Sequence, residues 1–285
     1  MDHIRTGPTA GKAESEEADE TADKAIGSMI LPAELMGNIR LVTVHGSLAP
    51  MEETLESWLV LHEDGDIMVV DKLAPLPVQA EKSGDAALQD LLRLKLAEAG
   101  EKEAAGQLEA AHRIDRRASG ALIFAKTRRA LETLEADFRE RRVSKRYIAC
   151  VEKQLPSASG SLVNRLSWDR RRNVVRAFPA DFEAAGMEAG EARLDYRLVC
   201  RSERYFFFEI ELITGRHHQI RAQLAAAGSP IRGDVKYGAK RTTRNGLIML
   251  HARRLEFVQP KTRDNLRIVA PFPSTEPLWA AFAED

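Results

Sequence analysis

Cysteine is nearly absent from this 285-residue chain, which contains only Cys150 and Cys200. Both lie inside apolar runs and neither belongs to a CxxC pair, so the sequence argues against a disulfide framework and a zinc ribbon. No apolar run approaches the roughly 18 residues of a membrane span, so we expect no membrane partner. The first residues lack the apolar core of a secretory signal and are acidic where a transit peptide would be rich in arginine. We therefore expect a protein of the reducing cytoplasm.

The charge is small overall but unevenly distributed. Residues 1–28 contain seven acids and three bases, a net charge of −4, whereas the whole chain carries −1 and the remainder therefore carries +3. This low-hydrophobicity segment predicts a disordered acidic tail. Residues 29–57 are too few for a separate folded domain, so we expect a short N-terminal extension. Residues 58–285 can bury one sizeable core and predict a single folded domain.

Hydrophobic periodicity predicts an α+β fold. Alternating or continuous apolar runs predict two hairpins and three further strands, at 58–72, 192–213, 121–125, 145–151 and 247–257. Helical spacing predicts helices at 85–99, 127–142, 215–228 and 278–282. We therefore expect a mixed, mainly antiparallel sheet flanked by helices and loops.

The stretch AHRIDRRASGALIFAK, residues 111–126, combines a polar turn with an apolar strand. Its single acid, Asp115, lies among three arginines. An Asp in a turn most often only accepts hydrogen bonds from backbone N–H groups, so a structural role is one interpretation. A reactive carboxylate held on a rigid strand is the other.

Five motifs together resemble one family. HRIDRRASG resembles the HRLDxxTSG signature of the RluA-type RNA pseudouridine synthases, with Ala118 in place of Thr. Four later segments resemble further motifs of that family in the same order, namely KRYIACV, TGRHHQIR, PIRGDVKYG and LHARRLEF. The resemblance extends from about residue 58 to the C-terminus. It implies the pseudouridine synthase fold, with residues 58–285 as the catalytic domain and an RNA-binding cleft across the sheet.

The resemblance also implies roles for particular residues. Asp115 is expected to be the catalytic carboxylate, Arg221 to pair with it, and Tyr147 to lie over the target base. Arg113 is expected to fill the space that the flipped uridine leaves, and Leu250 to line the pocket. Further substrate-binding residues are expected at Arg216 and His218. For Tyr147 the alternative is a half-buried packing residue with its hydroxyl at the surface.

The chemistry fits a single acid. Forming pseudouridine breaks the N-glycosidic bond, turns the uracil and rejoins it to the same sugar through C5, so no cofactor is required. A carboxylate attacks covalently or stabilises positive charge at the sugar, and it needs a nearby cation to stay ionised in a dry pocket. The target base must also leave the RNA stack. We expect a monomeric enzyme whose partner is ribosomal or transfer RNA.

A basic cluster lies between residues 162 and 178, around Trp168. Such clusters are often merely solvated surface, but arginine interleaved with tryptophan also suits phosphate tracking and base stacking. The predicted RNA-binding residues are Arg116, Arg165, Arg170, Arg171 and Arg172.

Histidines accompany two of the motifs, at His112, His217 and His218. Neighbouring histidines on a helix would point to different faces, and no HxxxH pattern or carboxylate partner completes a ligand set. We therefore predict structural imidazoles and no metal.

Two other functions compete with an RNA-modifying enzyme. One is an RNA-binding or ribosome-assembly protein of the same fold whose catalysis is dispensable. The other is an Asp-dependent hydrolase or metal enzyme acting on a small phosphorylated molecule, which the absence of a Walker loop or metal-ligand spacing disfavours.

Overall fold

The computed structural model describes residues 58–81, 84–183, 188–274 and 276–282. The predicted tail, 1–28, and extension, 29–57, lie outside these residues. Across the described ranges, no helix combines the length and apolar character that crossing a membrane requires.

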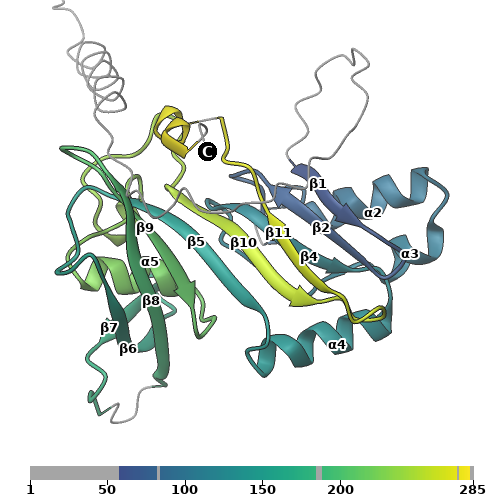
Figure 1. Ribbon diagram of the computed structural model, residues 1–285, viewed down its shortest axis with the longest axis horizontal. Helices are drawn as coiled ribbons and strands as arrows, with labels where there is room; N and C mark the ends of the chain where they lie inside the picture. The colour runs from purple at the N-terminus through teal and green to yellow at the C-terminus, as the bar shows by residue number, and fades with distance from the viewer. Residues whose placement is uncertain (1–57, 82–83, 184–187, 275, 283–285) are drawn as a thin grey trace, which may run out of the picture.

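A single eleven-stranded sheet organises the described residues (Figure 1). Its strands are β1 (Trp58–Glu63), β2 (Ile67–Lys72), β3 (Glu109–Ala110), β4 (Ser119–Ala125), β5 (Ser144–Val151), β6 (Ser159–Asp169), β7 (Val174–Phe178), β8 (Gly190–Arg201), β9 (Phe206–Leu212), β10 (Leu250–Val258) and β11 (Asn265–Val269). The order is β1-β2-β4-β10-β5-β9-β8-β6-β7, with β11 paired to β10 and β3 to β4. Only the β4–β10 pairing among these is parallel, which confirms the predicted mixed, mainly antiparallel sheet.

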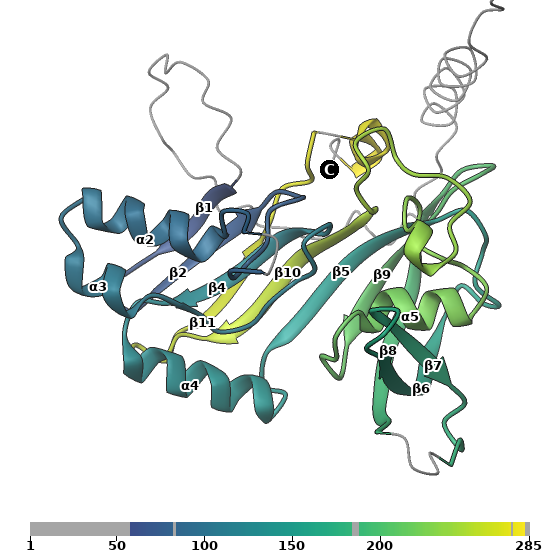
Figure 2. The same cartoon turned by 180° about the vertical axis from the view of Figure 1, so that it is seen from behind.

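The helices flank the sheet (Figures 1 and 2). They are α2 (Leu88–Glu98), α3 (Lys102–Gln107), α4 (Arg128–Arg139) and α5 (Gln219–Ala226), with two 3-10 turns, η2 (Val235–Tyr237) and η3 (Pro277–Phe282). Helices α2 and α4 pack on opposite faces of the β2–β4 region. Figure 2 shows α2 and α3 beside β1 and β2, and α5 beside β8 and the β6–β7 hairpin. Helices were predicted at all these places except α3 and η2, which are too short to show a helical period.

The strand that follows Asp115 is buried on both faces. Successive strand residues point to opposite sides of a sheet. Met68 and Phe124 accordingly pack in one apolar cluster with Leu92 of α2, while Ile67 packs in a second cluster with Leu134 of α4. Every residue of β2 and β4 is buried. The loop before β4 is therefore anchored to the most constrained part of the sheet.

The β6–β7 hairpin has a small apolar cluster of its own. Leu166, Val175 and Ala192 pack there with Ala222 of α5 and with Tyr237. The backbone N–H of Val175 also donates to the Tyr237 hydroxyl at 2.9 Å. These contacts fix the hairpin against α5.

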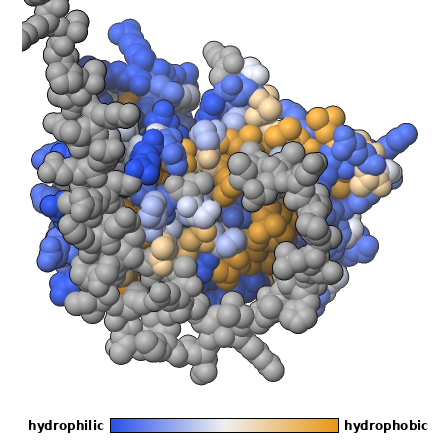
Figure 3. Space-filling model, turned by 90° about the horizontal axis from the view of Figure 1, so that it is seen from above, coloured by the Kyte–Doolittle hydropathy of each residue, from blue (hydrophilic) through white to orange (hydrophobic). Residues whose placement is uncertain are grey.

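Large apolar side chains are seldom exposed among the described residues. Those that are exposed are Leu59, Leu94, Val163, Trp168, Val235 and Val269. In the part of the upper face that Figure 3 leaves uncovered, hydrophobic residues gather toward the middle and hydrophilic residues line the margins. Trp168, 51% exposed, is the one aromatic residue in that group.

Gly120 permits the close approach of β4 to β10. Its φ is +118°, and a Cβ at this position would lie less than 3.0 Å from the backbone of Ala252. Gly120→Ala is therefore expected to destabilise the fold by about 1–3 kcal/mol from backbone strain, with the clash adding to this. Urea unfolding followed by circular dichroism measures the effect.

Gly106→Ala in α3 is the matched control. A Cβ there meets nothing within 4 Å and the residue is helical. Its expected effect is neutral or a gain of about 0.5–1 kcal/mol. Equal destabilisation by the two substitutions would contradict the explanation given for Gly120.

Candidate active site

The buried Lys72 stabilises the Asp115 loop through hydrogen bonds to its backbone. Lys72 donates from Nζ to the backbone carbonyls of Arg116 at 3.2 Å and Ala118 at 2.7 Å. Within the loop, the Ala118 N–H donates to the Asp115 carbonyl at 3.0 Å. Burial lowers the pKa of Lys72 to about 7, against the opposing charge of Asp115. From the sequence, Lys72 is predicted only as part of a hairpin strand, and its contact with the Asp115 loop was not foreseen.

The predicted partner of Asp115 is in place. Arg221 Nη1 lies 3.1 Å from Asp115 Oδ2, and the arginine side chain is 5% exposed. The other edge of the same guanidinium meets Asp234, with Nε 2.7 Å from Oδ2 and Nη2 2.8 Å from Oδ1. Although burial opposes the charged form, the hydrogen bonds with Asp234 and the charge of Asp115 raise the pKa of Arg221.

Asp234 is a site residue that sequence reasoning missed. Its side chain is 1% exposed and makes both hydrogen bonds to Arg221 just described. An isolated buried carboxylate is costly unless it is paired, so Asp234 and Arg221 stabilise each other. The available signal was an acid between the two glycines of PIRGDVKYG, a segment that was interpreted only as a family motif.

The segment before α5 is a turn and not the predicted first turn of a helix. The helix begins at Gln219, and His218 has a left-handed φ of +50°. The Gln219 side-chain oxygen accepts from the Arg216 N–H at 3.0 Å and from the Thr214 hydroxyl at 2.8 Å. The prediction of a helix from residue 215 was therefore wrong by four residues, because a side chain supplies the hydrogen bonds that stabilise the turn.

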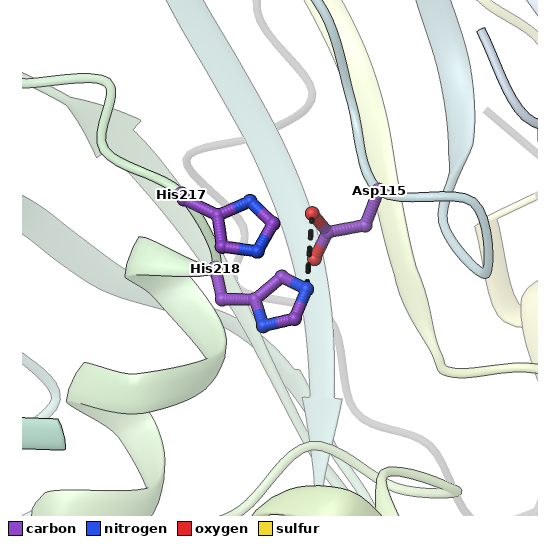
Figure 4. Close-up of side chains that lie close together, drawn as sticks. All are labelled: Asp115, His217 and His218. Carbon is purple, nitrogen blue, oxygen red and sulfur yellow. Dashed lines mark ion pairs between the residues drawn. The ribbon is translucent and has the colours of Figure 1, made fainter. Parts of the chain in front are cut away.

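This turn directs two histidines to Asp115 (Figure 4). The rings of His217 and His218 are stacked, with centroids 3.9 Å apart and planes inclined by 22°. His218 Nε2 lies 3.8 Å from Asp115 Oδ1. The expectation that the two imidazoles point to different faces and lack a carboxylate partner was wrong, because it assumed a helix at these positions.

His218 is hydrogen-bonded through Nδ1. This atom lies 2.7 Å from the Tyr237 hydroxyl, which also accepts from the Val175 N–H at 2.9 Å. The other ring nitrogen, Nε2, faces Asp115. Burial, followed by the charge of Arg221, lowers the pKa of His218 to about 2. The ring is therefore neutral near pH 7.

The histidine pair and the carboxylate also form a group of possible metal ligands. Ligand atoms of Asp115, His217 and His218 all lie within 4.8 Å of one another. Nearby cations act against a metal ion, because Arg113 and Lys236 lie close enough to lower the pKa of both histidines. The absence of a metal stays a prediction.

The third histidine has a structural role. His112 Nε2 accepts from the Ile123 N–H at 3.2 Å, and its ring packs on Phe138 at 4.7 Å. Burial lowers the pKa of His112 to about 3. This agrees with the prediction of a hydrogen-bonding imidazole.

An open cavity with about 360 Å³ of empty volume lies beside the carboxylate. Tyr147 of β5 and Leu250 of β10 supply apolar walls, and Asp115 and Arg221 supply charge. Tyr147 is 6% exposed, so it is not the surface packing residue of the alternative interpretation. Burial and the charge of Asp115 raise the pKa of Tyr147, so its hydroxyl stays protonated. The site thus combines the Asp115 carboxylate, the Arg221 guanidinium and a flat aromatic wall.

The remaining predicted substrate-binding residues lie around this cavity. His218 and Arg216 line it, and Arg216 donates from Nε to the Glu191 carbonyl. Its guanidinium occupies the space in which a side chain at Gly190 would stand. Arg113 is exposed on the Asp115 loop.

The predicted RNA-binding arginines divide into two groups. Arg116 forms an ion pair with Asp85 at 2.7 Å, and Arg165 donates to the Ala189 carbonyl at 2.9 Å, so both are engaged within the protein. The other three are exposed around the β6–β7 turn, at Arg170, Arg171 and Arg172. Sequence clustering alone does not separate an exposed arginine from one that pairs internally.

Comparison with solved structures defines the class of fold. The chain superposes on human RNA Pseudouridylate Synthase Domain Containing 4 with a TM-score of 0.64 and 22% identity, covering 77% of this chain and 90% of that one. At this identity the comparison shows the fold alone. It confirms the predicted pseudouridine synthase fold.

Comparison with sequences identifies the family. Ribosomal large subunit pseudouridine synthase C of Pasteurella multocida (strain Pm70) is 32% identical over 79% of this chain and 68% of its own length. Uncharacterized RNA pseudouridine synthase YhcT of Bacillus subtilis (strain 168) is 29% identical over 75% of this chain and 68% of its own. The chain thus spans about two thirds of these relatives. The family model described as RNA pseudouridylate synthase matches residues 66–226. This chain belongs to the RNA pseudouridylate synthase family, whose members are isomerases that act on RNA.

Proposed function

We propose that this chain, acting as a monomer, converts a uridine of large-subunit ribosomal RNA to pseudouridine, with Asp115 as the catalytic carboxylate. One observation carries the proposal. Asp115 lies 3.1 Å from the Arg221 guanidinium at the edge of a cavity walled by Tyr147 and Leu250. The choice of ribosomal over transfer RNA rests on relatives named as ribosomal large subunit pseudouridine synthases.

Each step of the proposed reaction has a suitable side chain at the cavity. Asp115 supplies the negative charge beside the sugar as the N-glycosidic bond breaks. Arg221, fixed by Asp234, balances that charge and orients the carboxylate. Tyr147 and Leu250 hold the detached uracil on apolar surface, and the protonated Tyr147 hydroxyl is placed to donate a hydrogen bond to it. The product contains the same atoms as the substrate.

Base flipping would bring the uridine to this site. Enzymes that act on a base in structured RNA draw it out of the stack, at a cost of a few kcal/mol. Arg113 is exposed two residues before Asp115, and we assign it to the space the base leaves. After burial, the positive charge of Arg113 is among the causes that lower the pKa of His217 and His218.

Mapping pseudouridine tests the function. Ribosomal and transfer RNA from cells with and without the protein are compared at single-nucleotide resolution. We expect at least one pseudouridine of large-subunit ribosomal RNA to depend on the protein. A site lost only from transfer RNA would redirect the substrate, and identical maps would contradict the proposed activity.

A second candidate is an RNA-binding or ribosome-assembly protein for which catalysis is dispensable. Complementing the deletion strain with Asp115→Ala separates the two. We expect this variant to leave the RNA unmodified, and any growth that it restores reports the binding role alone.

The exposed arginines of the β6–β7 turn predict a salt-dependent contact with RNA. Arg171→Ala with Arg172→Ala is expected to reduce the slope of log affinity against log salt by about 1.4, since each single-strand phosphate contact contributes about 0.7. Filter binding of ribosomal RNA across a salt series measures it. The matched control is Arg128→Ala with Arg129→Ala, which removes two exposed arginines of α4 away from the cavity. Equal changes in slope for the two pairs would show that the turn has no particular role.

A further inference from the structure

Four aromatic rings connect the surface of the β6–β7 hairpin to the catalytic carboxylate. The Trp168 ring lies 5.6 Å from His217, His217 stacks on His218 at 3.9 Å, and His218 meets Tyr237 edge-on at 5.5 Å. His218 in turn lies 3.8 Å from Asp115. Trp168 is therefore two ring contacts away from the residue that approaches the carboxylate.

The outer part of this row is open to solvent. Trp168 is 51% exposed and His217 is also exposed, whereas His218 and Tyr237 are largely covered. At 51% exposure part of the Trp168 ring is open to solvent, and exposed aromatic rings are surfaces on which unpaired bases stack. The exposed pair lies at the outer end of the row, beyond the cavity that we assign to the target uridine.

The electrostatic surroundings of the two exposed rings also suit a nucleotide. Partial burial lowers the pKa of His217, which favours its neutral form. The Arg170 guanidinium lies over the Trp168 ring, 5.6 Å from its centroid, and supplies positive charge for a neighbouring phosphate. An apolar face beside a cation matches a nucleotide, which has a flat base next to an anion.

The position of Trp168 is fixed and not incidental. Its strand neighbour Leu166 packs with Ala222 of α5, and Trp168 pairs with Val175, whose N–H bonds to Tyr237. The same Tyr237 hydroxyl holds His218. One set of contacts therefore sets the distance between the exposed rings and the active site.

We propose that Trp168 and His217 form a stacking platform for the base of a nucleotide adjacent to the target uridine, and so help to bind the RNA. The proposal rests on the proposed function, because the platform extends the site assigned to the target uridine. It gives Trp168 a substrate-binding role and no part in the bond-making steps.

A fluorescence titration tests the stacking. The full chain is titrated with single-stranded oligouridine of about 12 nucleotides, within the site sizes of such surfaces, and with an abasic ribose-phosphate strand of equal length. Trp168 is more exposed than Trp58 or Trp279, so bases that cover it are expected to quench the emission. Quenching by oligouridine but not by the abasic strand supports the platform. Equal quenching by both strands, or none by either, overturns it.

Variants separate stacking from charge. Trp168→Leu is expected to weaken oligouridine binding by about tenfold at an unchanged salt slope, and Trp168→Phe to restore most of it. Val163→Ala, an exposed apolar residue on the same strand, is the matched control and should bind normally. Equal affinity of Trp168→Leu and the unaltered chain overturns the proposal.

Activity on ribosomal RNA distinguishes the platform from the proposed function. Trp168→Leu is expected to raise KM about tenfold while kcat changes by less than about threefold, because stacking stabilises the bound RNA before and during reaction alike. A loss confined to kcat would indicate a structural role and overturn the platform.

If the unaltered chain makes no pseudouridine while Trp168 responds to bases, the proposed function fails and only RNA stacking stands. If product forms but Trp168→Leu matches the unaltered chain, the platform fails and the function stands.

Discussion

Asp115→Asn is expected to reduce pseudouridine formation by at least about 10⁴-fold, the scale of loss when an essential reacting group is removed. The amide has nearly the shape of the carboxylate and still reaches Arg221, but it has no negative charge to attack or stabilise the sugar. RNA affinity should change little, since the exposed arginines are untouched. Single-turnover conversion of ribosomal RNA measures the first expectation, and filter binding measures the second.

Asp90→Asn provides the control for removing one acid. Asp90 is a half-exposed residue of α2 that lies 3.6 Å from Arg93, away from the cavity. It is expected to leave activity and binding unchanged. Full product yield from Asp115→Asn would remove the proposed mechanism, whereas a parallel loss of RNA binding would indicate that the substitution disturbs the loop.

Asp234→Ala is expected to cost about 3–5 kcal/mol of stability, because it leaves the Arg221 guanidinium buried with half of its partners. Activity is expected to fall on the order of 100-fold even where the variant is folded, since Arg221 no longer holds Asp115 in position. Urea unfolding gives the stability, and initial rates well below the unfolding midpoint give the activity.

Asp137→Ala is the control that separates the loss of stability from the loss of activity. Asp137 is also a buried acid paired with an arginine, Arg142, but that arginine is 51% exposed and turns to water when its partner is lost. We expect a smaller cost of about 1 kcal/mol and unchanged turnover. Normal activity in folded Asp234→Ala would contradict the positioning role of Asp234.

Much of the secondary structure could be predicted from the sequence, because the local spacing of apolar residues determines it. The hairpin of β1 and β2 and the amphipathic helix α4 were read directly from apolar spacing and agree with the structure within a few residues. The pairing of Asp115 with Arg221 was also predicted, but only through the family motifs. Nothing local relates two residues 106 positions apart.

What was missed depends on tertiary contacts. Lys72 lies in a strand pattern and gives no sign that its amine reaches the carbonyls of a distant loop. The turn before α5 depends on the side chain of Gln219, which competes with the backbone for hydrogen bonds. Arg165 was counted among the RNA-binding arginines, yet it donates to a carbonyl within the protein. In each case a hydrogen bond, and not a hydrophobic period, decides the outcome.

The ion pair between Asp115 and Arg221 has a consequence for biosynthesis. Asp115 lies before β4 and is synthesised early, whereas Arg221 of α5 and its anchor Asp234 are synthesised more than 100 residues later. A nascent or clipped chain that ends before residue 234 contains the acid without its fixed counter-ion. Such a fragment has no assembled active site, so turnover reports that both halves of the molecule have folded and docked.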